Sequence, residues 1–525
     1  MSARVAARPP RTRWFWPVAL VGGAALLLFL GLFALDYSLQ RPQKSLLRLI
    51  FTYDPETAQN ALGNLAQVVV AVLGLVVTVV SIVVQLAANR YTPRITDLFF
   101  RDRTNLLVLG FFVTTSIAAV WVSLSVERDF VPERAITGTL LLVTLSLLLV
   151  IPYFGYVFDF LDPEAVIARI RDAALRHAAD GSEEPAHIEA RQRALLLRVT
   201  QLGDIAVNAV GNRDKIIATF AVDALKDLGV GYLARKAQNP ALWFHVGEAL
   251  GGDPDFVSMD PSSVADISGR RTWLEWKLLR QLQGIYSASL ADQPELSSLC
   301  AIDTRYLGEA ALATDEGQVL RLVVKFLNTD LRAALNGQRV RAAYNLLNQY
   351  RLLTERLLAS GDASHRLTED IAGYLRYYAQ VAQQQQLGFV AETVAYDLAA
   401  LCEVAHLRRS RAHDALLRCL LSVDQSAETE AQEKTLRGVR KAQAKLATLY
   451  LARGDEVHAR QIYEDMKDEH PERLRSIREE LEKIDAQDFW EIIDRGTNFD
   501  YLDDGRKAQL PRFFAWFSAG PEQKV

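Results

Sequence analysis

The feature that most constrains this chain is a set of four long apolar runs before residue 160. Each has about the 20 residues that an α-helix needs to cross roughly 30 Å of hydrocarbon. None carries a charged side chain in its interior, as expected when a charge at the bilayer centre costs several kcal/mol. The sequence therefore predicts four transmembrane helices, at Trp14–Leu35, Leu65–Leu86, Leu106–Val126 and Ile136–Phe158.

Basic residues in the flanks of these runs predict the orientation. Arginines gather in the N-terminal tail, between the second and third runs, and after the fourth, whereas acidic residues offset the arginines of the third loop. Because short cytoplasmic flanks carry an excess of Lys and Arg, we expect both termini in the cytoplasm. The first run exceeds the apolar core of a signal peptide, and LFALDYS has no small-x-small cleavage pattern, so we interpret it as an uncleaved anchor.

The connector between the second and third spans is both basic and amphipathic. Pro93 lacks an amide proton and is expected to end the second helix. The connector is predicted to be a cytoplasmic elbow in contact with membrane lipids, with four arginines that face anionic headgroups: Arg90, Arg94, Arg101 and Arg103. A solvated basic turn that only follows topology is the alternative.

Residues 58–113 carry motifs that resemble a known family. QLA-x-x-x-[FY]-[ST]-P-R is matched at Gln85–Arg94 and F-x-R-D at Phe99–Asp102, followed by a span that opens with VLG. The segment resembles a family of bacterial predicted integral membrane proteins catalogued as a domain of unknown function, and residues 201–225 look like a further shared element. A histidine pair common in that family is replaced by YFGYVFDF, residues 153–160. The resemblance implies a multi-pass protein of the bacterial inner membrane and supplies no activity.

A polar and small stripe follows the second span at alternating intervals of three and four residues, which places its members on one helical face. Its residues are Asn64, Gln67, Ala71, Gly74, Thr78, Ser81 and Gln85. Such a stripe favours close helix packing in lipid, within one subunit or in a dimer. The other hypothesis is a pore face around the axis of a homo-oligomer.

After residue 160 the chain becomes charged, alanine-rich and periodic at 3.6 residues, so we expect an all-α protein whose cytoplasmic part is an α-solenoid or irregular helical bundle. Predicted domains are 1–160 (membrane), 161–237 (membrane-proximal), 238–268 (irregular linker) and 269–525 (repeat-like). Helices are predicted at 187–210, 213–236, 270–291, 295–313, 316–335, 338–359, 365–385, 388–407, 411–424 and 427–453.

The segment 440–471 resembles a single degenerate tetratricopeptide repeat. Its matching positions are Leu446, Ala447, Tyr450, Gly454, Asp455, Ala459, Tyr463 and Pro471, whereas Gln443 replaces the usual tryptophan. Four later aromatic residues, Phe513, Phe514, Trp516 and Phe517, are expected to cap the helical array; insertion into the membrane interface is the alternative.

Motifs that carry chemistry are missing from the sequence. We find no phosphate-binding glycine loop, H-E-x-x-H, paired C-x-x-C or G-x-S-x-G, so no enzyme activity, cofactor or metal is predicted. The net charge of −4 implies no nucleic-acid partner. Cys300, Cys402 and Cys419 are expected to be buried free thiols, and His406 with His413 is interpreted as a chance cluster.

One polar group, Asp204, Asn208, Asn212 and Asp214, is a candidate ligand or partner site. Helix capping and a buried salt bridge are the favoured explanation of these residues, and the ligand or partner site is the alternative. The function expected from the sequence is a membrane-tethered interaction platform or sensor with a cytoplasmic protein or peptide partner, because tetratricopeptide-like surfaces bind peptides. The competing expectation is an oligomeric channel lined by the second span.

Overall fold

The computed structural model describes residues 27, 54–90, 96, 99–128, 130–178, 184–361, 365–423, 430–489, 494–496 and 498–518. These residues fall into two compact units, 1–166 and 167–525. Every regular element in the described ranges is a helix, apart from one isolated bridge between Glu127 and Phe130. The all-α prediction is therefore confirmed for the described part of the chain.

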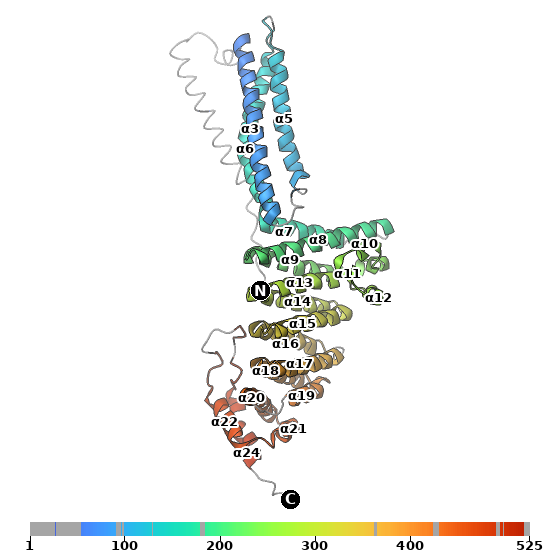
Figure 1. Ribbon diagram of the computed structural model, residues 1–525, viewed down its shortest axis with the longest axis vertical. Coiled ribbons are helices and arrows are strands. Elements are labelled where there is room, and N and C mark those ends of the chain that lie inside the picture. Colours follow the sequence, from blue (N-terminus) through green and yellow to red (C-terminus); the bar gives the residue numbers. More distant parts are fainter. Residues whose placement is uncertain are drawn as a thin grey trace. The chain divides into compact units, whose positions relative to one another are not determined.

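The N-terminal unit contains a bundle of three long helices, α3 (Pro55–Arg90), α5 (Arg103–Leu124) and α6 (Glu133–Leu161) (Figure 1). All three are long and apolar enough to cross a membrane. They confirm the second, third and fourth predicted spans. The first predicted span, 14–35, lies outside the described residues except for Leu27.

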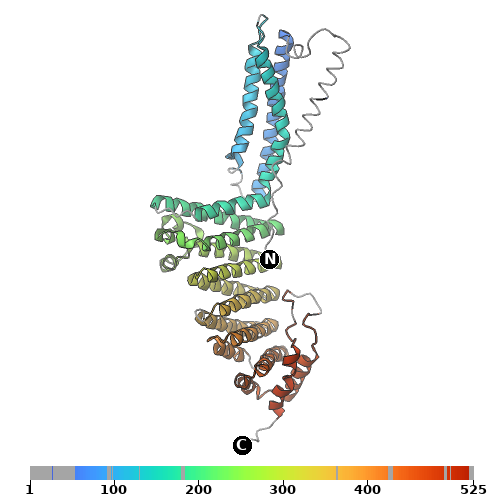
Figure 2. The same cartoon turned by 180° about the vertical axis from the view of Figure 1, so that it is seen from behind.

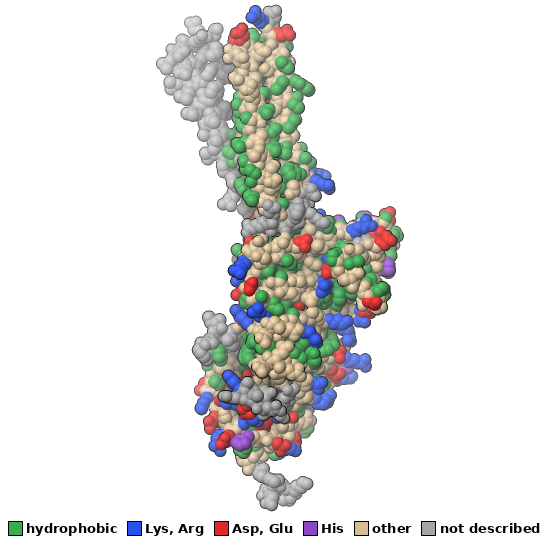
Figure 3. Space-filling view, in the orientation of Figure 1, with side chains coloured by type: hydrophobic (Ala, Val, Ile, Leu, Met, Phe, Trp, Pro, Cys, Tyr) green, Lys and Arg blue, Asp and Glu red, His purple; other side chains and the backbone are tan. Residues whose placement is uncertain are grey.

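The bundle buries little of its apolar surface. Only 22% of each apolar window is buried inside the protein, and hydrophobic side chains run along the outside of the helices, with charged ones at the ends (Figure 3). Its small core includes Val69 of α3, Phe112 of α5 and Val143 of α6. An apolar exterior around a thin core is what a lipid solvent permits, since lipid tails solvate valine and leucine as well as a protein interior does.

Two helices, at Pro55 and Pro163, begin at side-chain caps. Asp54 precedes Pro55 and accepts a hydrogen bond from the Thr57 amide at 3.1 Å, and Asp162 accepts one from the Ala165 amide at the same distance. From its cap, α3 runs for 36 residues, about 54 Å at 1.5 Å per residue.

The second unit is a stack of helices in two rows (Figures 1 and 2). One row is formed by α9, α14, α16, α18 and α20, each packed on the next, and the other by α8, α13, α15, α17 and α19. The row helices are α8 (Pro185–Gly211), α9 (Lys215–Leu233), α13 (Trp273–Ser289), α14 (Pro294–Ala313), α15 (Gly317–Asn336), α16 (Val340–Ala359), α17 (His365–Gln384), α18 (Gly388–Arg408), α19 (His413–Leu421) and α20 (Glu430–Ala452). This solenoid-like arrangement agrees with the predicted helices to within a few residues.

Smaller elements complete the unit. They are α7 (Pro163–Ala178), η2 (Lys236–Gln238), η3 (Ala241–Phe244), α10 (Glu248–Gly251), α11 (Pro254–Val257), α12 (Pro261–Gly269), α21 (Glu456–Met466), α22 (Pro471–Lys483), α23 (Asp504–Lys507) and α24 (Leu510–Ser518).

The segment predicted as a linker, 238–268, differs from that expectation. It folds into short helices whose Trp243 and Phe256 are buried, and the Trp243 carbonyl accepts hydrogen bonds from Gln192 of α8 and from the Trp273 indole of α13. Because α8 and α9 also pack directly on α13 and α14, the helices before and after the segment form one continuous stack.

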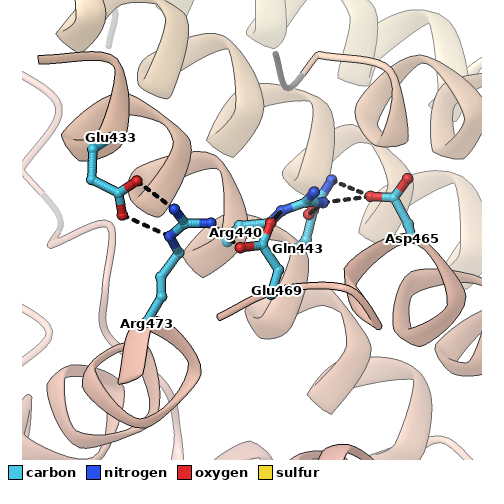
Figure 4. Close-up of polar contacts among 6 residues, drawn as sticks. All are labelled: Glu433, Arg440, Gln443, Asp465, Glu469 and Arg473. Carbon is cyan, nitrogen blue, oxygen red and sulfur yellow. Dashed lines mark hydrogen bonds and ion pairs between the residues drawn. The ribbon is translucent and has the colours of Figure 1, made fainter. Parts of the chain in front are cut away.

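The last helices are joined by a buried polar network (Figure 4). Arg440 of α20 contacts Asp465 at 2.5 Å, Glu469 at 2.6 Å and its own neighbour Gln443 at 2.7 Å. Arg473 of α22 reaches Glu469 and Glu433. Gln443, at the position where a tetratricopeptide repeat has tryptophan, is thus fully buried but satisfied by charge-assisted partners.

The C-terminal aromatic helix caps this end of the unit. Phe513 and Phe514 of α24 are buried, and Tyr463 of α21 makes edge contacts with Trp516 at 5.8 Å and Phe517 at 4.9 Å between ring centroids. The prediction that these aromatics dock on the helical array is confirmed.

Candidate functional site

A segment after α22 crosses the outer surface of three row helices. We call residues 494–508 the tail segment, of which all but residue 497 are described; it has no regular structure until α23 begins at Asp504. It contacts α16, α18 and α20 in turn. The side chains that it contacts form the tail-binding surface: Arg341, Tyr344 and Asn345 of α16, Tyr396, Asp397 and Glu403 of α18, and Lys441 and Lys445 of α20.

The most buried contact is an ion pair between Arg495 of the tail segment and Asp397 of α18. The guanidinium reaches the two carboxylate oxygens at 2.5 and 3.2 Å and donates to the Tyr344 carbonyl at 2.7 Å. Both charged side chains are only 2–3% exposed, and the guanidinium also stacks on the Tyr344 ring at 4.3 Å. A bidentate pair of this kind selects arginine over lysine because its planar fork matches a carboxylate.

An aromatic and acidic pair follows four residues later. Phe499 stacks on Tyr396 with centroids 4.7 Å apart and planes at 12°. Asp500 accepts hydrogen bonds from the Tyr396 hydroxyl and from Lys441 at 2.8 Å, while Lys445 donates to the Phe499 carbonyl at 2.8 Å. Burial, together with the nearby Arg506, lowers the pKa of Lys445 to about 8.

A cavity of about 320 Å³ remains beside these contacts. Its lining includes Arg351, Glu403, Lys445, Gln487, Asp503 and Arg506, so it is enclosed partly by the row helices and partly by the tail. Arg506 closes one side through its ion pair with Glu403, and Arg351 lies 3.3 Å from Asp397. The site therefore combines three features. They are the Asp397 carboxylate and Tyr344 ring that bind Arg495, which we call the arginine slot, the Tyr396 ring that stacks on Phe499, and the charged cavity.

Three histidines meet elsewhere in the same unit. His406, His413 and His458 each place a ring nitrogen within 4.8 Å of the others, next to Asp414, Asp455 and Tyr450. The sequence paired His406 with His413 as a chance cluster and missed His458, which is 45 positions beyond His413. Among the described residues, these three histidines form a group that could hold a metal ion.

Among the described helices, the polar stripe of α3 does not lie at the contacts with α5 and α6. Asn64, Gln67, Gly74, Thr78 and Gln85 are exposed and Ser81 is half-buried, whereas α5 and α6 cover a valine and alanine face that includes Val69, Val76 and Val80. The buried polar contacts are instead on the other helices, where Ser146 of α6 donates to Thr115 of α5 at 3.1 Å. No described helix covers the stripe, and its role stays a prediction.

The arginine elbow is described only in part. Arg101 and Arg103 are exposed, whereas Arg94 and the side chain of Arg90 lie outside the described residues. The F-x-R-D element itself packs on the YFGYVFDF stretch, since the Phe99 and Phe160 rings meet at 5.3 Å and the Tyr156 hydroxyl donates to Asp102 at 2.5 Å. Tyr153 likewise donates to Asn105 at 2.6 Å, a pairing that sequence reasoning missed.

The candidate partner site at the turn between α8 and α9 is largely used for capping. Asp214 is the N-cap of α9 and accepts from the Ile217 amide at 3.2 Å, and Asn212 is the C-cap of α8. Asp204 and Asn208 are exposed on α8. A ligand or partner role for these four residues stays a prediction.

Comparison with known protein families finds a similarity for the N-terminal region. Residues 11–199 match the family described as "Predicted membrane protein (DUF2254)". This part of the chain is similar to that family. The match ends before residue 201, so the resemblance of residues 201–225 and that of the tetratricopeptide-like hairpin stay predictions. The chain is accordingly a predicted membrane protein with several apolar helices.

Two further comparisons add little. No curated protein matches the chain. A solved structure entitled "Circular tandem repeat protein with novel repeat topology and enhanced subunit contact surfaces" is 15% identical, with 71% of this chain and 85% of that chain covered and a TM-score of 0.30. A likeness at that score carries no argument about fold or function.

Proposed function

We propose that this protein is a membrane-tethered interaction platform, with both termini in the cytoplasm of a bacterium, whose tail-binding surface receives a segment of a partner protein. The observation that carries this proposal is the way the tail segment is bound: Arg495, Phe499 and Asp500 each contact a complementary feature, and together these features come from three successive row helices. Binding of an irregular segment through a few inserted side chains on the surface of a helical solenoid is a general mode of peptide binding.

Release of the tail segment would not leave an unpaired buried charge on the tail-binding surface. Asp397 contacts Arg351 of α16 at 3.3 Å as well as Arg495. If Arg495 leaves, Arg351 still neutralises the carboxylate, which avoids the several kcal/mol that an unpaired buried ion costs. The tail segment then acts as an internal competitor, and a partner with an R-x-x-x-F-D pattern is the expected external ligand.

A peptide-binding measurement tests the proposal on the full chain in detergent. In Arg495→Ala/Phe499→Ala/Asp500→Ala the tail should leave its surface, and a fluorescent peptide of residues 493–507 should bind this variant saturably while wild type binds it at least tenfold more weakly. A peptide with the same three alanines is the matched control and should not bind. Adding Asp397→Asn to the variant should weaken binding, because the arginine slot loses its charge.

Two results would argue against this function. One is a lack of peptide binding to a variant that circular dichroism shows to be folded. The other is equal binding of the native and triple-alanine peptides, which would show that the surface does not read the pattern.

A channel is the alternative function, and the exposure of the α3 stripe favours it. Thr78 is exposed and donates back to the Gly74 carbonyl at 2.8 Å, so its hydroxyl stays on the outer face of the helix. Rings of such groups around an oligomer axis can replace part of an ion's hydration shell. Under this hypothesis Thr78→Leu/Ser81→Leu abolishes ion flux in liposomes, and a monomer in detergent removes the channel hypothesis.

A further inference from the structure

The three-histidine cluster is formed by helix ends that the fold brings together. His406 lies in the last turn of α18, His413 is the first residue of α19, and His458 lies in the first turn of α21. A left-handed residue, Arg409, turns the chain between α18 and α19, and Gly454 does the same between α20 and α21. The ring centroids of His413 and His458 are 4.6 Å apart, and His406 is 5.4 and 6.2 Å from them.

The Asp455 carboxylate orients one of the three rings and lies near a second. Asp455 lies 2.6 Å from Nδ1 of His458 and 3.6 Å from Nδ1 of His406. A carboxylate on one ring nitrogen fixes the tautomer and turns the other nitrogen toward the cluster, the arrangement that accompanies metal-binding histidines. Asp455 itself is held in place as the N-cap of α21, since it accepts a hydrogen bond from the His458 amide at 3.2 Å.

A fourth group supplies an oxygen. One carboxylate oxygen of Asp414 lies 3.2 Å from His413 and 3.4 Å from His458. The Asp414 side chain is 70% exposed, so it can rotate toward a cation without breaking the core. Tyr450 adds a hydroxyl that lies 2.7 Å from Nε2 of His413.

We propose that His406, His413 and His458, with Asp414 as an oxygen ligand, form a binding site for a divalent transition-metal cation of the Zn²⁺ class. Imidazole nitrogen suits zinc and its neighbours, whereas Mg²⁺ and Ca²⁺ prefer sites made of oxygen alone. Three nitrogens and one oxygen make the four-coordinate set that zinc adopts. In a tetrahedral site with bonds near 2.05 Å the ligand atoms lie about 3.3 Å apart, so ring nitrogens that now lie within 4.8 Å of one another can reach this spacing by small side-chain rotations.

The site is reachable and links two parts of the helical stack. His406 and His458 keep 22% and 23% of their side chains exposed, whereas His413 is 9% exposed. A bound cation would join the end of α18 and the start of α19 to the α20–α21 hairpin. Metal binding should therefore stabilise the docking of this hairpin, independently of what the tail-binding surface does.

The test uses the full chain in detergent, purified with a tag that contains no histidine. After chelator treatment and reloading with Zn²⁺, wild type should retain about one zinc per chain by elemental analysis, and Co²⁺ should give the visible absorption of a tetrahedral site. His406→Ala/His458→Ala should lose both signals. The matched control His187→Ala/His245→Ala removes two exposed histidines elsewhere in the unit and should keep them.

Further measurements keep the test decisive if the double variant misfolds. Asp414→Asn changes an exposed side chain and should lower zinc affinity at least tenfold. X-ray absorption of zinc-loaded wild type should show three imidazole nitrogens at about 2.0 Å. Zinc retention by a folded double variant, or a spectrum without imidazole scattering, would overturn the proposal.

Discussion

Asp330 of α15 is a buried carboxyl whose burial raises its pKa to about 8. Its Oδ1 atom has no hydrogen-bond partner among the described residues, and the residue is 2% exposed. The carboxyl is therefore protonated in the folded protein at neutral pH but ionised in the unfolded chain. Because the folded state holds the extra proton, stability falls as the pH rises from about 4 to about 8.

Asp330→Asn should remove this pH dependence, since the amide stays neutral. Between pH 5.5 and pH 8.5 wild type should lose about 3 kcal/mol of stability relative to the variant, measured by chemical unfolding. The exposed Asp292→Asn is the control and should follow wild type. Parallel pH profiles for wild type and Asp330→Asn would refute the prediction.

Lys277 of α13 is a buried cation held by two carboxylates. Its Nζ lies 2.8 Å from Asp253 and 2.7 Å from Asp255, and its side chain is 2% exposed. Lys277→Met preserves the volume but leaves Asp253 without its cation and Asp255 with only Arg280 at 3.6 Å, so it should cost about 3–5 kcal/mol. Adding Asp253→Asn and Asp255→Asn should recover most of the loss in thermal unfolding, because amides tolerate burial and asparagine still caps α11. A triple variant as unstable as Lys277→Met would show that changed side-chain packing, and not the loss of the cation beside Asp253 and Asp255, causes the loss of stability.

At the scale of elements, α24 depends on one aromatic anchor. Phe513 is fully buried, and a helix of nine residues is not stable alone in water. Phe513→Ala should cost about 3–5 kcal/mol of local docking energy and expose α24 to limited proteolysis while the preceding helices stay resistant. Arg512→Ala, on the same helix, removes an exposed ion pair with Glu456 and should change the cleavage rate little.

The elements were more predictable than the sites, for a physical reason. Helix starts such as those at Pro55 and Pro163 depend on residues within one turn, so the sequence carries the whole signal. The tail-binding surface depends on pairs such as Arg495 with Asp397, which are 98 positions apart and have no spacing rule. The histidine cluster combines three helix ends, so only the stacking of α18, α19 and α21 reveals it. The sequence predicts a linker at 238–268 because the local signal of proline and glycine outweighs that of a few aromatic residues that become buried.

At the scale of the whole molecule, the distribution of arginine is the basis for the proposed orientation. Residues 125–132, between α5 and α6, carry Arg128 together with Glu127, whereas Arg101 and Arg103 flank the other end of α5 without a matching acidic excess. Short loops with more Lys and Arg residues are retained in the cytoplasm. The loop after α5 should therefore be extracytoplasmic, and the helical stack cytoplasmic.

Cysteine accessibility tests this orientation in a chain whose native Cys300, Cys402 and Cys419 are replaced by alanine. Ser125→Cys lies in the loop after α5 and Ser258→Cys in the helical stack, and both positions are exposed. A membrane-impermeant maleimide should label Ser125→Cys in intact bacterial cells with a permeabilised outer membrane, but should label Ser258→Cys only after lysis. Both should react equally in detergent, which controls for intrinsic reactivity. The reverse pattern would place the tail-binding surface and the histidine cluster outside the cytoplasm, where a partner segment or a metal ion would have to be extracytoplasmic.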